Sequence, residues 1–95
     1  MKIKGRIAVV TGGADGIGKG LCERFAKEGA AKVIVVDRNG EGAKKVADAI
    51  GGIAYACDVS KEPEIQRIVE EVERNVGPIS IFCSNAGIGD FGGRP

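Results

Sequence analysis

The residues best suited to chemistry lie in one glycine-rich run, VVTGGADGIGKG, at positions 9–20. The run follows an apolar segment and leads into residues with helical spacing, which is typical of a turn between a strand and a helix. Backbone N–H groups in such a turn point toward the first turn of the helix, where the positive end of the helix dipole favours an anion. Glycines let the anion approach the backbone closely. The run therefore predicts a phosphate-binding loop.

Two kinds of phosphate-binding loop match parts of this run. Residues 13–20 nearly fit GxxxxGK[ST], the nucleoside-triphosphate loop, and Asp37 at the end of an apolar run would then help to hold magnesium. That loop needs a hydroxyl after Lys19 to bind the metal, but the residue there is Gly20, which has no side chain. The dinucleotide pattern GxGxxG is also absent as written. The spacing that is present, at residues 11–18, is TGxxxGxG.

The elements that must position this loop alternate between two periodicities. Short runs of Ile, Val and small residues predict strands at 6–10, 33–36, 53–57 and 79–83. Apolar stripes at helical spacing predict three intervening helices, with stripes of Ile17, Leu21 and Phe25; Ala43, Val46, Ala47 and Ile50; and Ile65, Ile68, Val69, Val72 and Val76. The second and fourth strands lack polar alternation, which favours a parallel sheet covered on both faces. The pattern predicts a doubly wound α/β sheet.

Composition excludes several classes of function. The chain has 95 residues, which suits one small domain, and its 14 Lys and Arg residues nearly balance 13 Asp and Glu residues. This balance gives no electrostatic reason to expect binding to nucleic acid or to a membrane surface. The apolar runs are far shorter than the roughly 20 residues that cross a bilayer, and no signal-peptide block follows the basic N-terminus. We expect a cytoplasmic protein.

Four motifs together resemble the N-terminal half of the short-chain dehydrogenase/reductase family. Residues 11–18 match the TGxxxGIG loop, Asp37 ends the second strand, Asp58-Val59 closes the third, and Asn85-Ala86-Gly87 follows the fourth. The resemblance covers the whole chain. It implies a Rossmann-type doubly wound parallel sheet, truncated to about four strands in the order 3-2-1-4 and three helices. Residues 1–95 would then be an NAD(P)-binding half-domain from which the catalytic and substrate part is absent.

The resemblance implies that the loop backbone holds the cofactor pyrophosphate. This role falls on Gly12, Ala14, Asp15, Gly16, Ile17 and Gly18, and Ile17 would also close over the nicotinamide. The alternative is a cluster of turn glycines that only permits tight packing of strand and helix. Asp15 departs from the Ser or Arg often found there, and its other possible role is the N-cap of the helix that follows.

The remaining motifs imply contacts with the two ribose rings and the adenine. Asp37 would accept hydrogen bonds from the adenosine ribose and repel a 2′-phosphate, so NAD is expected over NADP, although Arg38 beside it could pair with such a phosphate. Asp58 and Val59 resemble the pair at the adenine, and Asn85, Ala86 and Gly87 the segment beneath the second ribose. The alternatives are a solvated acid at a strand end for Asp37, a turn before Ser60 for Asp58, and a β-turn for Asn85.

The family's proton relay is absent from this sequence. The relay uses a Tyr, a Lys four residues later and a Ser, but the only tyrosine here, Tyr55, has Val59 at the Lys position and is expected to be a packing residue.

We therefore expect an NAD-dependent oxidoreductase acting on an alcohol or ketone, inactive as these 95 residues alone. The alternatives are a stand-alone dinucleotide-binding module and a degenerate triphosphate loop. An exposed fourth strand would favour self-association, so we expect a homo-oligomer.

Two further expectations concern local chemistry. Ser60 is predicted to cap a helix that begins at Lys61, and Gly77-Pro78 to end it. The three cysteines, Cys22, Cys57 and Cys83, are expected to be reduced thiols, since the chain has neither a CxxC pair nor a His for a metal site. In the strand order 3-2-1-4, Cys57 and Cys83 would lie roughly 14 Å apart, too far for a disulfide.

Overall fold

Strands and helices alternate along the chain in the computed structural model, which describes residues 2–58 and 60–85. The elements in chain order are β1 (Ile7–Thr11), α1 (Gly16–Lys27), β2 (Lys32–Asp37), α2 (Gly40–Ile50), β3 (Ile53–Ala56), α3 (Glu62–Asn75) and β4 (Ile81–Ser84). All four predicted strands and all three predicted helices are present. Their bounds differ from the predicted ones by one or two residues at several ends.

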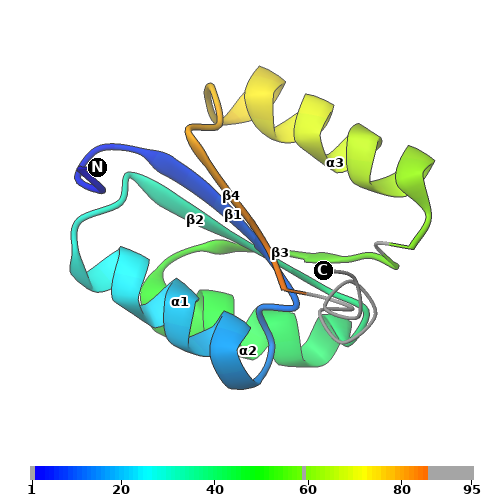
Figure 1. The fold of residues 1–95 in the computed structure, drawn as a ribbon, viewed down its shortest axis with the longest axis horizontal. Coiled ribbons are helices and arrows are strands. Elements are labelled where there is room, and N and C mark those ends of the chain that lie inside the picture. The colour runs from blue at the N-terminus through cyan, green and yellow to red at the C-terminus, as the bar shows by residue number, and fades with distance from the viewer. Residues whose placement is uncertain (1, 59, 86–95) are drawn as a thin grey trace, which may run out of the picture.

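The strands form one parallel sheet in the order β3-β2-β1-β4. Helices α1 and α2 lie on one face of the sheet and α3 lies on the other (Figure 1). This arrangement confirms the predicted doubly wound, Rossmann-type sheet and its strand order. β4 begins at Ile81 rather than at residue 79, because the Ile79 N–H donates to a Glu73 carboxylate oxygen (3.3 Å) and not to a neighbouring strand.

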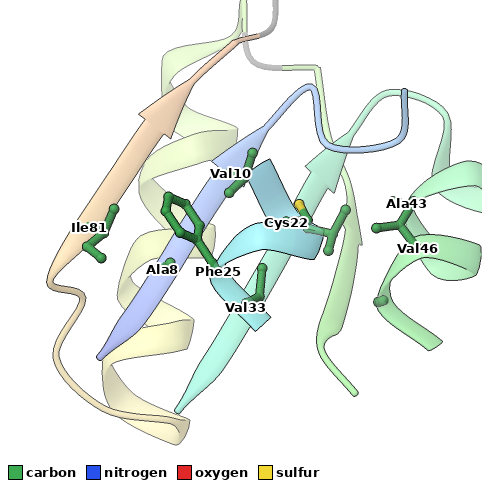
Figure 2. Packing of buried hydrophobic residues seen from close by; sticks show 10 residues of the cluster. Ala8, Val10, Cys22, Phe25, Val33, Ala43, Val46 and Ile81 are labelled. Carbon is green, nitrogen blue, oxygen red and sulfur yellow. The ribbon is translucent and has the colours of Figure 1, made fainter. Parts of the chain in front are cut away.

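The two central strands supply most of the core, and every residue of β1 is buried. Alternate residues of β1 point into two apolar clusters, one beneath α1 and α2 and one beneath α3. Figure 2 shows the first cluster, in which Cys22 and Phe25 of α1 pack against Ala8 and Val10. The second cluster contains Ile7, Val9, Ile34, Val36, Cys57, Ile68 and Val72. Burial of each such aliphatic side chain stabilises the fold by about 1.5–3 kcal/mol.

The ends of the helices agree with the sequence analysis in one case and differ in another. Asp15 is the N-cap of α1, which was the alternative role given to it, and its side chain accepts a hydrogen bond from the Gly16 N–H. The prediction that Ser60 caps the next helix is wrong. Lys61 is the N-cap of α3, and its side chain makes no cap bond because an ammonium group cannot accept one. The Ser60 hydroxyl donates to Asp58 (2.7 Å).

The edges of the sheet are β3 and β4. Within residues 2–58 and 60–85, β4 pairs only with β1, and Phe82 in β4 is 46% exposed. All three cysteines are free thiols, as predicted, and Cys57 and Cys83 belong to opposite edges of the sheet.

Two glycines of α1 offer a matched pair of substitutions. A Cβ on Gly18 would overlap the carbonyl group of Gly12, whereas a Cβ on Gly20 would meet open space. We expect Gly18→Ala to lower the free energy of unfolding by about 1–3 kcal/mol through overpacking. Gly20→Ala should raise it by up to about 1 kcal/mol, since Ala is the better helix former. Urea denaturation followed by circular dichroism measures both, and equal effects would contradict the tight approach of α1 to the loop.

Candidate functional site

The carboxyl ends of the four strands meet at one edge of the sheet, since all four are parallel. Thr11 at the end of β1 lies beside Val36 of β2 and Ser84 of β4. Open α/β sheets bind ligands outside this edge, at the point where the strand order reverses. Here the chain runs outward from β1 through β2 to β3 and then returns to β4, so the reversal lies next to β1. The glycine-rich loop leaves β1 at this point.

Backbone geometry explains why this loop needs glycine. Gly12 and Gly16 have φ angles of 67° and 56°, in the left-handed region that side chains disfavour. Gly13 has no room for a side chain, since a Cβ there would lie 2.8 Å from Val35 and 3.1 Å from the Cys22 sulfur. The Gly13 N–H donates to the carbonyl oxygen of Val36 (3.2 Å), which ties the loop to β2. The loop is thus held closely against the sheet.

Asp37, the last residue of β2, meets the glycine loop directly. Its Oδ2 accepts a hydrogen bond from the Ala14 N–H (3.1 Å), and its Oδ1 accepts one from the Asn39 N–H (2.9 Å). The carboxylate and the loop therefore meet at the carboxyl edge of the sheet, where α/β sheets form the crevice that takes their ligands. The Ala14 N–H, which the resemblance assigns to the pyrophosphate, donates to Asp37 here.

The outer part of the loop faces solvent. Asp15, Gly16 and Ile17 are exposed, and the Ile17 side chain is 73% exposed although it is large and apolar. The Asp15 carboxylate accepts a hydrogen bond from the Gly16 N–H (2.8 Å). The backbone carbonyl oxygen of Asp15 accepts one from the Lys19 N–H (3.2 Å). The first turn of α1 thus presents an accessible N-terminus that carries one negative side chain. Gly18 is buried behind it, against Gly12.

Asp58 follows β3 at the same edge of the sheet. Hydrogen bonds from the Ser60 hydroxyl (2.7 Å) and N–H (3.0 Å) hold the pKa of Asp58 below its ordinary value, and the nearby Arg38 charge lowers this pKa further. Arg38 is therefore close enough to Asp58 to favour its ionised form. Val59, the predicted apolar contact for adenine, lies outside the described residues.

The end of β4 is joined to the end of β1. The Asn85 N–H donates to both the carbonyl oxygen (3.2 Å) and the hydroxyl oxygen (3.0 Å) of Thr11. The Asn85 Nδ2 atom is buried and has no hydrogen-bond partner in the described part of the chain. Ala86 and Gly87, predicted beneath the second ribose, lie outside the described residues. Of the predicted segment, the structure therefore places Asn85 alone at the crevice.

The geometry does not support the triphosphate-loop alternative. Helix α1 begins at Gly16, so Lys19 lies within the helix rather than at its start. Gly20 supplies no hydroxyl for a metal, and both oxygens of Asp37 accept backbone N–H groups. Among residues 2–58 and 60–85, no group of three or more His, Cys, Asp or Glu side chains is placed to hold a metal ion. None of the helices in that part is long and apolar enough to cross a bilayer.

Asn39 and Gly42 are two site residues that the sequence analysis did not single out. Asn39 is the N-cap of α2, and its side-chain oxygen accepts a hydrogen bond from the Gly42 N–H (3.0 Å). An Asn directly before a helical stripe is a recognised N-cap pattern, so the cap itself was predictable. The hydrogen bond from the Asn39 N–H to Asp37 was not predictable, because it depends on the path of the backbone after the end of β2.

Tyr55 lies on the α3 side of the sheet, where it packs against the second apolar cluster. Its hydroxyl donates to Glu71 of α3 (2.7 Å). Burial, followed by this hydrogen bond and then by the Glu71 charge, raises the Tyr55 pKa to about 12. A tyrosine that exchanges protons with a substrate needs the opposite shift. The packing role predicted for Tyr55 agrees with this position, beside a hollow of about 230 Å³ that Cys57, Glu64 and Arg67 also line.

A family model described as short chain dehydrogenase matches residues 6–94. The chain belongs to the short-chain dehydrogenase family. Members of this family are oxidoreductases that bind nicotinamide dinucleotide cofactors. The TGxxxGIG loop and its contact with Asp37 lie within the matched residues.

Proteins similar to this chain differ in the reaction that their names describe. Zerumbone synthase of Zingiber zerumbet is 38% identical over an alignment of 92 residues, which covers 93% of this chain and 34% of that protein. The human 3-oxoacyl-[acyl-carrier-protein] reductase is 38% identical over an alignment of 85 residues, which covers 87% of this chain and 35% of that protein. The crystal structure of ribose-5-phosphate isomerase from Brucella melitensis 16M superposes with a TM-score of 0.84 at 37% identity, covering 90% of this chain and 33% of that chain. The chain thus spans about a third of the length of these relatives.

Tyr55 permits a direct test of the geometry on the α3 side, because it is the only tyrosine and the chain has no tryptophan. Absorbance at about 295 nm should report a phenol titration with a midpoint near 12 in the folded chain, against the ordinary value of 10.0. Since the folded pKa is the higher one, Tyr55 stabilises the fold below pH 10, and this contribution is lost as the pH rises toward 12.

Glu71→Gln removes the charge that opposes ionisation of Tyr55. The midpoint should fall but stay above 10, because burial is the larger cause of the shift. The urea-unfolded chain serves as the control, and circular dichroism at each pH verifies that the fold persists. A folded chain that titrates at the unfolded value would contradict the Tyr55–Glu71 contact.

Proposed function

We propose that this chain is the NAD(H)-binding portion of a short-chain dehydrogenase that oxidises an alcohol or reduces a ketone. The observation that carries the proposal is the hydrogen bond between the Ala14 N–H and Asp37 (3.1 Å). This bond brings a carboxylate into contact with the loop that precedes α1, at the carboxyl edge of the sheet where the strand order reverses. An adenosine diphosphate group needs both features, an acceptor for ribose hydroxyls and donors for phosphate.

The donor set of the loop suits a pyrophosphate. Residues 15–17 are exposed at the start of α1, where the helix dipole favours negative charge. Gly16 has nothing within 4 Å of the position of a Cβ, so a ligand can approach this residue closely, where its N–H donates to the Asp15 carboxylate in the structure. Ile17 offers an exposed apolar surface beside these groups. We propose that Gly12, Ala14, Asp15, Gly16, Ile17 and Gly18 form the pyrophosphate cradle.

Asp37 is suited to bind the adenosine ribose, although both of its oxygens already accept N–H groups. Each carboxylate oxygen has two lone pairs, so one remains on each oxygen for a ribose hydroxyl. A 2′-phosphate at this position would face a fixed negative charge, which favours NAD over NADP. Arg38, the basic residue beside Asp37, favours the ionised form of Asp58 and so lowers the pKa of that carboxyl. We propose that Asp58 and Val59 contact the adenine, and Asn85, Ala86 and Gly87 the second ribose.

Catalysis requires residues that this sequence does not supply. When bound, the nicotinamide carries the hydride, and the family's Tyr, Lys and Ser handle the substrate oxygen. Tyr55 does not fit that role, since its pKa is raised and it lies on the α3 side of the sheet. We propose that these 95 residues bind the cofactor without turnover. A Ser and a YxxxK motif encoded downstream of Pro95 would favour the enzyme over a stand-alone binding module.

Titration with dinucleotides tests the proposed function. The chain should bind NADH, and it should bind ATP no more tightly when magnesium is added, because Gly20 offers the metal no ligand. Asp37→Ala should weaken NADH binding by about tenfold or more, since hydrogen bonds to a charged group contribute about 1.5–3 kcal/mol. NADPH binding should change less, because the hydrogen bonds lost from Asp37 are offset by relief of the repulsion between its carboxylate and the 2′-phosphate. Equal losses for NADH and NADPH would rule out the role of Asp37.

Asp15 tests the phosphate position independently. Its carboxylate lies at the N-terminus of α1, where it repels a bound pyrophosphate. Asp15→Asn keeps the cap and removes the charge, so NADH affinity should rise about fivefold at low salt, equivalent to about 1 kcal/mol. The gain should shrink in high salt, where exposed charges are screened. Asp15→Ala is the control for the cap, and weaker NADH binding by Asp15→Asn would place the phosphates elsewhere.

A further inference from the structure

We infer that Asn39 is a positioning residue that holds Asp37 and the glycine loop together and thereby determines the preference for NAD over NADP. The inference rests on the proposed function, because it assigns a specificity role within the same crevice. Asn39 does not itself need to contact the cofactor. It acts through the Asp37 carboxylate, because the Asn39 backbone N–H donates to one carboxylate oxygen while the loop donates to the other.

Four residues form a closed ring of contacts across the crevice. The Ala14 N–H donates to Asp37 Oδ2 (3.1 Å), and the Asn39 N–H donates to Asp37 Oδ1 (2.9 Å). The Gly42 N–H donates to Asn39 Oδ1 (3.0 Å). The ring closes between Gly42 and Ala14, because a Cβ on Gly42 would lie only 3.0 Å from the Cβ of Ala14. The first turn of α2 is therefore packed on the glycine loop.

The Asn39 side chain is the part of the ring that a substitution can remove. As the N-cap of α2, Asn39 has extended backbone angles (φ −81°, ψ 90°) that direct its own N–H toward Asp37. Its side-chain bond to Gly42 satisfies a helix N–H that has no partner within the helix, which fixes the residue in this conformation. Without the side chain, the N-cap loosens, and the N–H that orients Asp37 loosens with it.

Orientation of Asp37 matters more for one cofactor than for the other. A fixed carboxylate can accept both ribose hydroxyls of NAD and cannot turn away from a 2′-phosphate. A loosened carboxylate binds the ribose less well, but it can rotate to relieve repulsion of the 2′-phosphate. Loss of the Asn39 side chain should therefore lower NADH affinity selectively. A purely structural role would lower the affinities for NADH and NADPH by the same factor.

The experiment compares Asn39→Ala with Asn39→Ser in the full 95-residue chain, because Ser retains an N-cap oxygen. NADH and NADPH titrations should show NADH affinity falling about tenfold in Asn39→Ala and NADPH affinity falling less than about twofold. Asn39→Ser should stay within about twofold of the wild type for both. The amide resonance of Ala14 in the ligand-free chain should shift in Asn39→Ala and remain near its wild-type position in Asn39→Ser.

Gly42→Ala is a second variant in case Asn39→Ala does not fold. An added methyl group would lie 2.6 Å from the Asn39 side-chain nitrogen and 3.0 Å from the Ala14 Cβ, so the Asn39 side chain must shift away from its place in the ring while it remains present. The same selective loss of NADH affinity is expected, and circular dichroism verifies the folded state.

The outcomes separate this inference from the proposed function. Equal loss of NADH and NADPH affinity in a folded ring variant overturns the positioning role and leaves the proposed function standing. An unchanged Ala14 resonance in Asn39→Ala overturns the coupling between Asn39 and the loop. A wild-type chain that binds neither dinucleotide overturns the proposed function and the specificity role, whereas a shifted Ala14 resonance in that case still supports the coupling.

Discussion

The hydrogen bond from the Ala14 N–H to Asp37 is the interaction on which the site depends. It joins the glycine loop, which follows β1, to the carboxylate of the last residue of β2. A hydrogen bond of this kind, from a backbone N–H to an ionised acid, is stronger than one between neutral groups. The loop is already tied to β2 through Gly13 and Val36, so the second bond fixes its orientation rather than only its position. The two hydrogen bonds consequently hold the loop against the end of β2.

The sheet makes this geometry possible because its central strands are buried on both faces. β1 and β2 have an apolar cluster on either side, which prevents them from shifting relative to each other without loss of packing. The positions of Thr11 and Asp37, at the carboxyl ends of these two strands, are therefore fixed relative to each other. The register that places Thr11 beside Val36 sets the spacing between the loop and the acid. Core residues thus determine the shape of the site without contacting it.

Much of this arrangement was predictable from sequence, and the remainder depends on tertiary contacts. The alternation of strands and helices followed from apolar runs and their periodicity, which are local properties, whereas the strand order and the meeting of Asp37 with the loop followed from the resemblance to the short-chain dehydrogenase family. The N-cap of α3 was not predictable in this way, because Ser60 is a good capping residue whose hydroxyl is taken by Asp58. The ring through Asn39 and Gly42 was also missed. Its closure depends on α2 packing against the loop, which residue spacing alone does not show.

The contacts between the glycine loop and Asp37 lie early in the chain. Ala14 and Asp37 are 23 positions apart, and the ring that supports their hydrogen bond ends at Gly42, whereas the Asn85 N–H joins Thr11 across 74 positions. Closing a short segment has a low entropic cost and is fast. During synthesis, the loop, Asp37 and the start of α2 can therefore come together before β4 leaves the ribosome and pairs with the other side of β1.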